Sequence, residues 1–169
     1  INTKNSDYGA TFYGKDKLVF ASPKKGITLV NEVWEGNQQR FLELYIADIT
    51  ENQELINTKP LKGEINTRYH EADVTFTKDK KTVYFTRNNF YNKKLAQDEK
   101  QMTNLAMFKA TVNSQVEWVN VIPMPFNNVS YSVGHPALST DEKTLYFVSD
   151  MPGSLGQTDI FKVEVNESG

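Results

Sequence analysis

The sequence predicts an all-β protein built from repeated units of antiparallel strands. Short runs of β-branched and aromatic residues bounded by turn residues are typical of strands, and Thr144–Val148 and Asp159–Val165 are two of them. The polar turn Thr140–Lys143 joins the first of these to an earlier run, Pro136–Ser139. The same arrangement recurs along the 169-residue chain, which makes the repeat the main determinant of the predicted fold.

The repeat is clearest at the start of each unit. Residues Ile1–Phe12 align without a gap with Ile65–Phe76, and Asn127–Leu138 forms a third copy in which Asn128 is placed under Asn66. An ungapped match of this length argues against a β-sandwich with coincidental repeats, which is the alternative all-β fold. We therefore expect one domain made of three units.

The three units are expected to span residues 1–61, 62–126 and 127–169. The predicted second strands are Lys17–Phe20, Thr82–Phe85 and Thr144–Phe147. The predicted third strands are Leu44–Ala47, Met107–Ala110 and Ile160–Val163. The predicted fourth strands are Glu54–Leu61 and Val116–Pro123, so the third unit is incomplete.

Four-stranded units repeated at a long period are typical of a β-propeller, whose blades pack face to face around a channel. A strand covered on both faces by neighbouring blades should be continuously apolar instead of alternating. Thr82–Phe85 and Thr144–Phe147 meet this expectation. Propellers close with about four to eight blades, so three blades predict an open arc of a larger propeller.

Both ends of such an arc are expected to expose flat apolar faces. The chain begins at Ile1 with no Met, so we expect a fragment whose further blades cover these faces. The alternative is a symmetric pairing of two copies into a six-bladed dimer.

Residues of the third unit carry a family resemblance. Ser139–Phe147, Ser149–Gly153 and Gly156–Phe161 are similar to the TolB-type, WD-repeat-like propeller repeat, whose pattern is S-P-D-G-K-x-L-Y-F-x-S-D followed by P-G-G-x-G-G-x-D-I-Y. Tyr131–Ala137 resembles a variant common in outer-membrane proteins of the Bacteroidetes type. Those proteins carry this propeller upstream of a peptidoglycan-binding OmpA-like domain, and they include a component of the type IX (Por) secretion system.

The resemblance implies a periplasmic, outer-membrane-associated protein that binds protein partners in the cell envelope. Any contact with peptidoglycan would be made by a domain outside this chain. Three residues depart from the family pattern: Lys80 and Glu142 occupy positions where the family prefers Gly, and Gln157 replaces the second Gly of the loop. A non-Gly residue in a left-handed turn costs about 1–2 kcal/mol, so these hairpins are expected to use another turn type.

Composition narrows the function classes. The net charge of −2 comes from interspersed acids and bases, without the basic stripe that nucleic-acid binding needs. No apolar run is long enough to span a bilayer, so direct membrane insertion is not expected. The absence of Cys excludes disulfides and thiol catalysis, and it fits a periplasmic protein.

Length variation between the units falls in the loops between second and third strands, at Pro23–Arg40, Arg87–Asn104 and Met151–Gln157. Insertions concentrated on one face of a repeat protein mark its binding face. Ile27–Trp34 is expected to form an extended arm that turns back as a hairpin, and Lys93–Gln101 is expected to be a mobile loop. Aromatic residues, Met and Arg are enriched in protein interfaces, and the alternative is that the aromatic side chains only pack these loops onto the blades. The interface candidates of these types are Trp34, Arg40, Arg68, Tyr69, Arg87, Phe90, Tyr91, Tyr131 and Met151.

Catalytic and metal sites are less well supported by the residues. Thr77–Tyr84 and Ser139–Tyr146 are similar to the Asp-box of sialidase propellers, but this motif is also a turn device whose carboxylate accepts backbone N–H groups. No nucleophile and acid of a sialidase can be assigned, no G-x-S-x-G elbow occurs, and His70 and His135 are not equivalent in the repeat. We therefore expect a non-catalytic interaction module without cofactor or metal. The alternative is a carbohydrate-active propeller enzyme of the sialidase or five-bladed glycosidase type, which would require carboxylates converging with the arginines.

Overall fold

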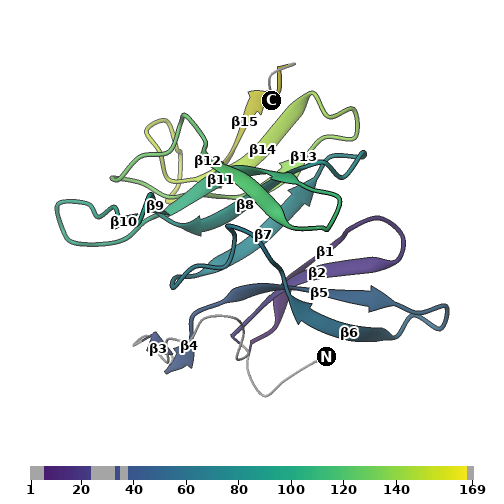
Figure 1. Ribbon diagram of the computed structural model, residues 1–169. Coiled ribbons are helices and arrows are strands. Elements are labelled where there is room, and N and C mark those ends of the chain that lie inside the picture. The colour runs from purple at the N-terminus through teal and green to yellow at the C-terminus, as the bar shows by residue number, and fades with distance from the viewer. Residues whose placement is uncertain (1–5, 24–32, 35–37, 167–169) are drawn as a thin grey trace.

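The computed structural model describes residues 6–23, 33–34 and 38–166, and it is an all-β structure of three antiparallel sheets (Figure 1). The first sheet has the order β1 (Tyr8–Phe12), β2 (Lys17–Ser22), β5 (Glu43–Ile49) and β6 (Leu55–Pro60). The second sheet contains β7 (Glu71–Phe76), β8 (Thr82–Asn88), β11 (Leu105–Val112) and β12 (Trp118–Pro123). The third sheet contains β13 (Val133–Leu138), β14 (Thr144–Ser149) and β15 (Asp159–Glu164). The predicted second, third and fourth strands are confirmed.

Two short hairpins lie outside these sheets. Strands β3 (Val33–Trp34) and β4 (Gln39–Arg40) pair in the first, which confirms the return at Trp34, whereas the earlier part of the predicted arm, Ile27–Glu32, lies outside the described residues. Strands β9 (Phe90–Tyr91) and β10 (Lys94–Leu95) pair in the second. Residues 93–101, expected to be a mobile loop, thus form one hairpin strand and a turn that the Asp98 carboxylate closes by accepting the backbone N–H of Lys100 and Met102.

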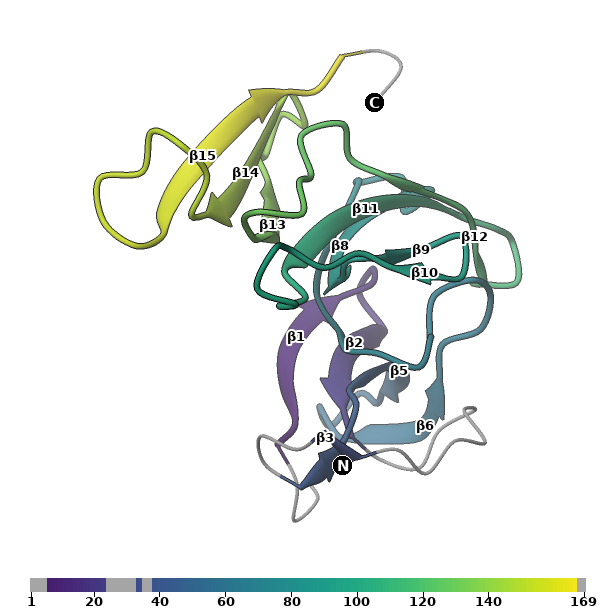
Figure 2. The ribbon, with the colours of Figure 1, turned by 90° about the vertical axis from the view of Figure 1, so that its left-hand side faces the viewer.

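The second sheet lies between the other two, as Figures 1 and 2 show from two directions. One core joins the first and second sheets, and its buried members include Val19, Leu44, Val83 and Phe108. A smaller core joins the second and third sheets through residues such as Tyr84, Met107, Leu145 and Phe147. Strand β8 is buried on both faces because adjacent residues of it point into different cores.

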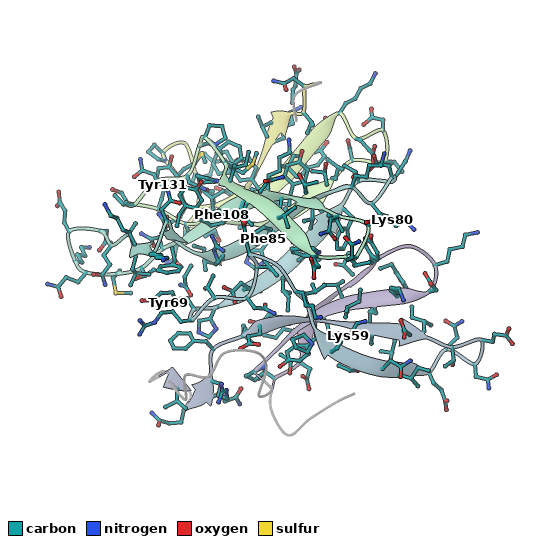
Figure 3. The ribbon with its side chains drawn as sticks, viewed as in Figure 1. Lys59, Tyr69, Lys80, Phe85, Phe108 and Tyr131 are labelled. Atoms are coloured by element: carbon teal, nitrogen blue, oxygen red, sulfur yellow. The ribbon has the colours of Figure 1, made fainter. Side chains whose placement is uncertain are left out.

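Strand pairing aligns the three sheets residue by residue. The second strands share an equivalent position that is occupied by Val19, Tyr84 and Tyr146. The third strands share another that is occupied by Leu44, Met107 and Ile160. The same register places a ring pair in every sheet, with centroids 5.7–5.9 Å apart and interplanar angles of 20–24°: Phe20–Tyr45, Phe85–Phe108 and Phe147–Phe161. Figure 3 shows the middle pair, Phe85 and Phe108, inside the molecule.

The outer faces of the two end sheets differ. On the third sheet, Tyr146 is 41% exposed and Ile160 is 76% exposed, as expected for an apolar face that no sheet covers. On the first sheet, the expectation is wrong for the middle of the outer face, where Phe20 and Tyr45 are buried. Their rings stack on each other, and Leu55 packs against them.

The tight hairpins between first and second strands place a non-Gly residue in the left-handed region in the second and third sheets. Lys80 and Glu142 each have a φ of 61°, which lies in the left-handed region. The expectation that these hairpins use another turn type is therefore wrong. In each turn an Asp carboxylate, of Asp79 or Asp141, accepts the hydroxyl of Thr77 or Ser139 at 2.7 Å and a backbone N–H two residues later. These bonds hold the turn although a side chain occupies its left-handed position.

An asparagine side chain clamps each of the two later connections to a third strand. The amide of Asn66 accepts from Leu44 N at 2.8 Å and donates to Leu44 O at 3.0 Å. Asn127, not Asn128, makes the same pair of bonds with Met107. The predicted alignment is therefore wrong by one residue here, because one extra residue separates Asn127 from strand β13; the alignment of β7 with β13 is unaffected.

The connection from the first to the second sheet passes close to β12. Trp118 N donates to Lys62 O at 3.0 Å, and Glu64 N donates to Trp118 O at 2.7 Å. Gly63 lies between these bonds with a φ of 109°, and a Cβ placed on it would be 2.1 Å from Trp118 O. The close approach of the two backbones therefore requires Gly at this position.

Candidate functional site

Connections between second and third strands lie on one side of the molecule, and the tight Asp-containing turns lie on the other. Figure 3 shows Tyr69 and Tyr131 on the first side and Lys80 on the second. The hairpins β3–β4 and β9–β10 extend on the Tyr69 side in Figure 1. We call this the loop side.

Four rings from three connections gather on the loop side. Tyr69 contacts Phe41 at a centroid distance of 5.9 Å and Phe90 at 5.0 Å, and Phe41 contacts His70 at 4.7 Å. The exposed Arg68 places its guanidinium 5.6 Å from the centre of the Tyr69 ring. Three of the candidates from the sequence, Arg68, Tyr69 and Phe90, are thus brought together in this aromatic cluster.

Other candidates contact the cores of the molecule. Arg87 is only 3% exposed, and its guanidinium lies 4.2 Å from the centre of the Phe108 ring, so it is not a surface contact on the loop side. Tyr91 packs against the same ring at 6.1 Å. Tyr131 and Met151 pack on the core between the second and third sheets, and the Tyr131 hydroxyl donates to Phe126 O. For these residues the alternative explanation, packing of the loops, describes their positions.

Two candidates remain. Arg40 lies on β4 and is half-buried beside a cavity described below. Trp34 pairs with Gln39 through the backbone of the β3–β4 hairpin, and its side chain is outside what the structure describes.

A cavity of about 660 Å³ is lined by residues of the first strands β1, β7 and β13, which form the inner edge of the three sheets, and by residues of the connections on the loop side. Its aromatic lining comes from Tyr8, Phe41 and Tyr69. Its ionisable side chains, apart from the tyrosines, are those of Arg40, His70, Asp73 and His135. We call it the inner-edge pocket. A volume of this size is typical of sites for small molecules or peptide side chains.

Each first strand carries a β-bulge at the same position of the repeat. The residues there are Gly9, Asp73 and His135, with φ values of 67°, 42° and 52°. Bulges re-aim side chains and are common beside functional sites. Here they place two ionisable residues, Asp73 and His135, on the adjacent first strands β7 and β13.

Asp73 and His135 form an ion pair across the second and third sheets. The distance from Asp73 Oδ2 to His135 Nδ1 is 2.9 Å, and this hydrogen bond raises the pKa of His135. His135 N donates to Thr86 Oγ1 at 2.8 Å, which fixes the backbone of the bulge. Nε2, on the other edge of the His135 ring, has no hydrogen-bond partner among the described residues, and the side chain is 55% exposed.

His70 is held differently. Its Nδ1 accepts Leu42 N at 3.1 Å, and its backbone N–H donates to Asn88 Oδ1 at 3.0 Å. Burial lowers the pKa of His70, which favours the neutral ring. Since Nδ1 accepts a hydrogen bond, the proton of the neutral ring is on Nε2.

The sequence contained a signal for the bulges that its analysis did not use. Gly9, Asp73 and His135 fall in one column of the twelve-residue alignment. A Gly within a predicted strand indicates a bulge or a close backbone approach. That signal places residue 73 and residue 135 at equivalent positions of neighbouring inner strands.

Carboxylates do not gather in the pocket as a glycosidase would require. In the part of the chain that the structure describes, Asp73 is the one carboxylate lining it, and no group of three or more His, Asp or Glu side chains could hold a metal ion. Glu71, two residues before Asp73, is fully buried, and its carboxylate accepts hydrogen bonds from Thr67 N and Thr67 Oγ1.

No protein-family model matches the chain, and no curated protein matches its sequence. Among the described residues there is also no helix with the length and hydrophobicity needed to cross a bilayer.

Proposed function

We propose that the three sheets are consecutive blades of an open β-propeller arc, and that the arc is a non-catalytic protein–protein interaction module. The observation that carries the proposal is the repetition of one packing geometry. The same stacked ring pair recurs in each sheet, and the residue equivalent to Ile160 is buried wherever another sheet follows, as at Leu44 and Met107. A blade repeat explains both regularities.

The open face of the third sheet is then the position of the next blade. Ile160 and Tyr146 are the equivalents of the buried residues Met107 and Tyr84, so a further sheet with the same ring pair would cover them. The buried Phe20 and Tyr45 argue against a second copy of the first sheet as the occupant, because they would have to be uncovered first.

The aromatic cluster on the loop side supports the binding of a protein. Arg68, Tyr69 and Phe90 are of the residue types that dominate interface energetics, and they are already held in mutual contact. Pre-organised side chains lose less entropy on binding. The resemblance in the third unit suggests a periplasmic, outer-membrane-associated setting with partners in the cell envelope.

Retention of envelope proteins on the immobilised chain tests this function. Phe90→Ala should abolish the retention of a specific protein from solubilised envelopes while leaving the thermal midpoint nearly unchanged. Lys78→Ala, an exposed change on the opposite side, is the matched control. Equal retention by both variants, or turnover of aryl glycosides or sialosides by the wild-type chain, would overturn the proposal.

A further inference from the structure

The three bulges place residues 9, 73 and 135 next to each other at the inner edge. A Cβ on Gly9 would be 3.1 Å from Asp73 Oδ1, and Asp73 in turn is paired with His135. Side-chain bonds at a neighbouring position tie the same strands together: Thr11 Oγ1 donates to Val74 O at 3.0 Å, and Thr75 Oγ1 accepts Leu138 N at 3.4 Å. The order of the inner strands therefore fixes the positions of the two ionisable side chains.

Asp73 and His135 occupy a left-handed backbone conformation that favours Gly, which the first strand does have at this position. Non-Gly residues in this region are uncommon and cluster at functional sites. Nothing in the packing of the sheets requires a side chain here, since Gly9 forms the same bulge without one. The two side chains pair across the second and third sheets, and they are also candidates for contact with a ligand.

Apart from the tyrosines, the ionisable groups that line the pocket in the described structure are one Arg, two His and a single carboxylate, that of Asp73. Asp73 is already engaged by His135, which leaves His135 Nε2 directed away from that carboxylate. Arg40 and His70 line the same cavity. The apolar walls come from Tyr8, Phe41 and Tyr69. This combination fits a ligand with a carboxylate beside an apolar group.

We propose that the inner-edge pocket binds an acidic peptide segment, with the carboxylate of a Glu or Asp side chain accepting a hydrogen bond from His135 Nε2 and the flanking residues packing on Tyr8 and Tyr69. Asp73 is the positioning residue, because its carboxylate accepts the Nδ1–H of His135 and so sets the ring orientation. The same bond raises the pKa of His135 and so favours the imidazolium, in which Nε2 also carries a proton that it can donate. The inference rests on the proposed function for the source of the peptide, a partner protein.

Charged groups on the strands packed against β13 do not compete for this role. Glu71 and Arg87 are buried and do not line the pocket. Lys109, on β11, is paired with Tyr84 in the sheet, and Tyr84 belongs to the core between the second and third sheets. Among the charged groups of these strands in the described structure, Asp73 is the one paired with the His135 ring.

Proton NMR gives a direct test, because the chain has only two histidines. The probe is the peptide acetyl-Ala-Glu-Phe-amide, and its Gln analogue is the matched control. The Glu peptide should shift the His135 Cε1–H resonance saturably, and the Gln peptide should bind at least about ten-fold more weakly, as loss of a charge-assisted hydrogen bond predicts.

Two variants separate binding from folding. His135→Asn introduces a residue that tolerates the left-handed region. This variant should lower the affinity for the Glu peptide about ten-fold or more at an unchanged thermal midpoint. If the Asn variant does not fold, His135→Gly replaces it. Asp73→Asn should lower the pKa of His135, so that its weakened binding near pH 7 recovers near pH 5.5. A purely structural Asp73 would give no such recovery.

Equal binding of the Glu and Gln peptides, or no saturable shift, would overturn the inference. A saturable shift with the methyl glycoside of sialic acid and none with the peptide would overturn it in favour of a glycan carboxylate. A chain that ignores the peptide but still retains an envelope protein through Phe90 contradicts this inference and leaves the proposed function standing.

Discussion

At the scale of single residues, Glu71 couples stability to pH. Its side chain is fully buried, and burial raises its pKa well above the ordinary value of 4.5 despite two bonds from Thr67. The folded protein therefore holds the proton that the unfolded chain releases, so this contribution to stability is complete below the unfolded pKa and is lost as pH rises toward the folded pKa.

The variant Glu71→Gln should make stability less dependent on pH. Gln retains an oxygen that can accept the Thr67 bonds, and it has no charge to bury. Urea unfolding between about pH 5 and about pH 8 should show the wild type losing stability relative to the variant as pH rises. Glu99→Gln, at an exposed position, should leave the wild-type profile unchanged; parallel profiles for wild type and Glu71→Gln would refute this account.

Gly63 is the residue whose backbone freedom matters most for packing. In Gly63→Ala the new Cβ would overlap the Trp118 carbonyl at 2.1 Å, in addition to the strain of a φ of 109°. We expect a loss of about 3 kcal/mol or more in the free energy of unfolding. Gly153→Ala is the matched control, because its φ is 104° but nothing lies within 4 Å of its Cβ position. It should lose only the strain, about 1–2 kcal/mol. Similar losses in the two variants would show that overlap with Trp118 is relieved by movement.

At the scale of elements, the Asp-containing turns are stable despite an unfavourable residue. Lys80 holds a φ of 61°, so Lys80→Gly should raise the free energy of unfolding by up to about 1 kcal/mol. The gain is limited because Lys80 Nζ also lies 5.5 Å from the centre of the Tyr13 ring. Lys78→Gly in the same turn should give no gain, since Lys78 is not in the left-handed region. A loss of stability in Lys80→Gly would assign more weight to the Tyr13 contact than to backbone strain.

At the scale of the whole molecule, equivalent residues of the sheets differ in whether a neighbouring sheet covers them. Met107 and Ile160 are equivalent, but Met107 is fully buried and Ile160 is 76% exposed. Met107→Ala should therefore cost about 2–5 kcal/mol, whereas Ile160→Ala should cost less than about 0.5 kcal/mol in this chain. Chemical denaturation measures both, and equal losses would contradict the description of the third sheet as uncovered.

Local patterns in the sequence predicted the strands, their antiparallel order and the Asp-containing turns. Runs such as Thr82–Phe85 identify strands because side-chain alternation and turn residues act over a few positions. The aligned starts of the units placed β7 and β13 in the correct register. The all-β class with antiparallel sheets was accessible for this reason, and so was the side of the molecule that holds the longer connections.

The sequence by itself determined where the strands and turns lie, because these depend on residues close together in the chain. Only the tertiary structure decided which side chains meet across sheets. It buried Arg87 against Phe108, assigned the clamp to Asn127, and brought Asp73 to within 2.9 Å of His135. These contacts depend on how two sheets dock and where one extra residue falls, and neither is encoded in a local pattern. The inner-edge pocket exists for the same reason: its lining comes from connections and strands that are distant in sequence and adjacent only once the sheets are stacked.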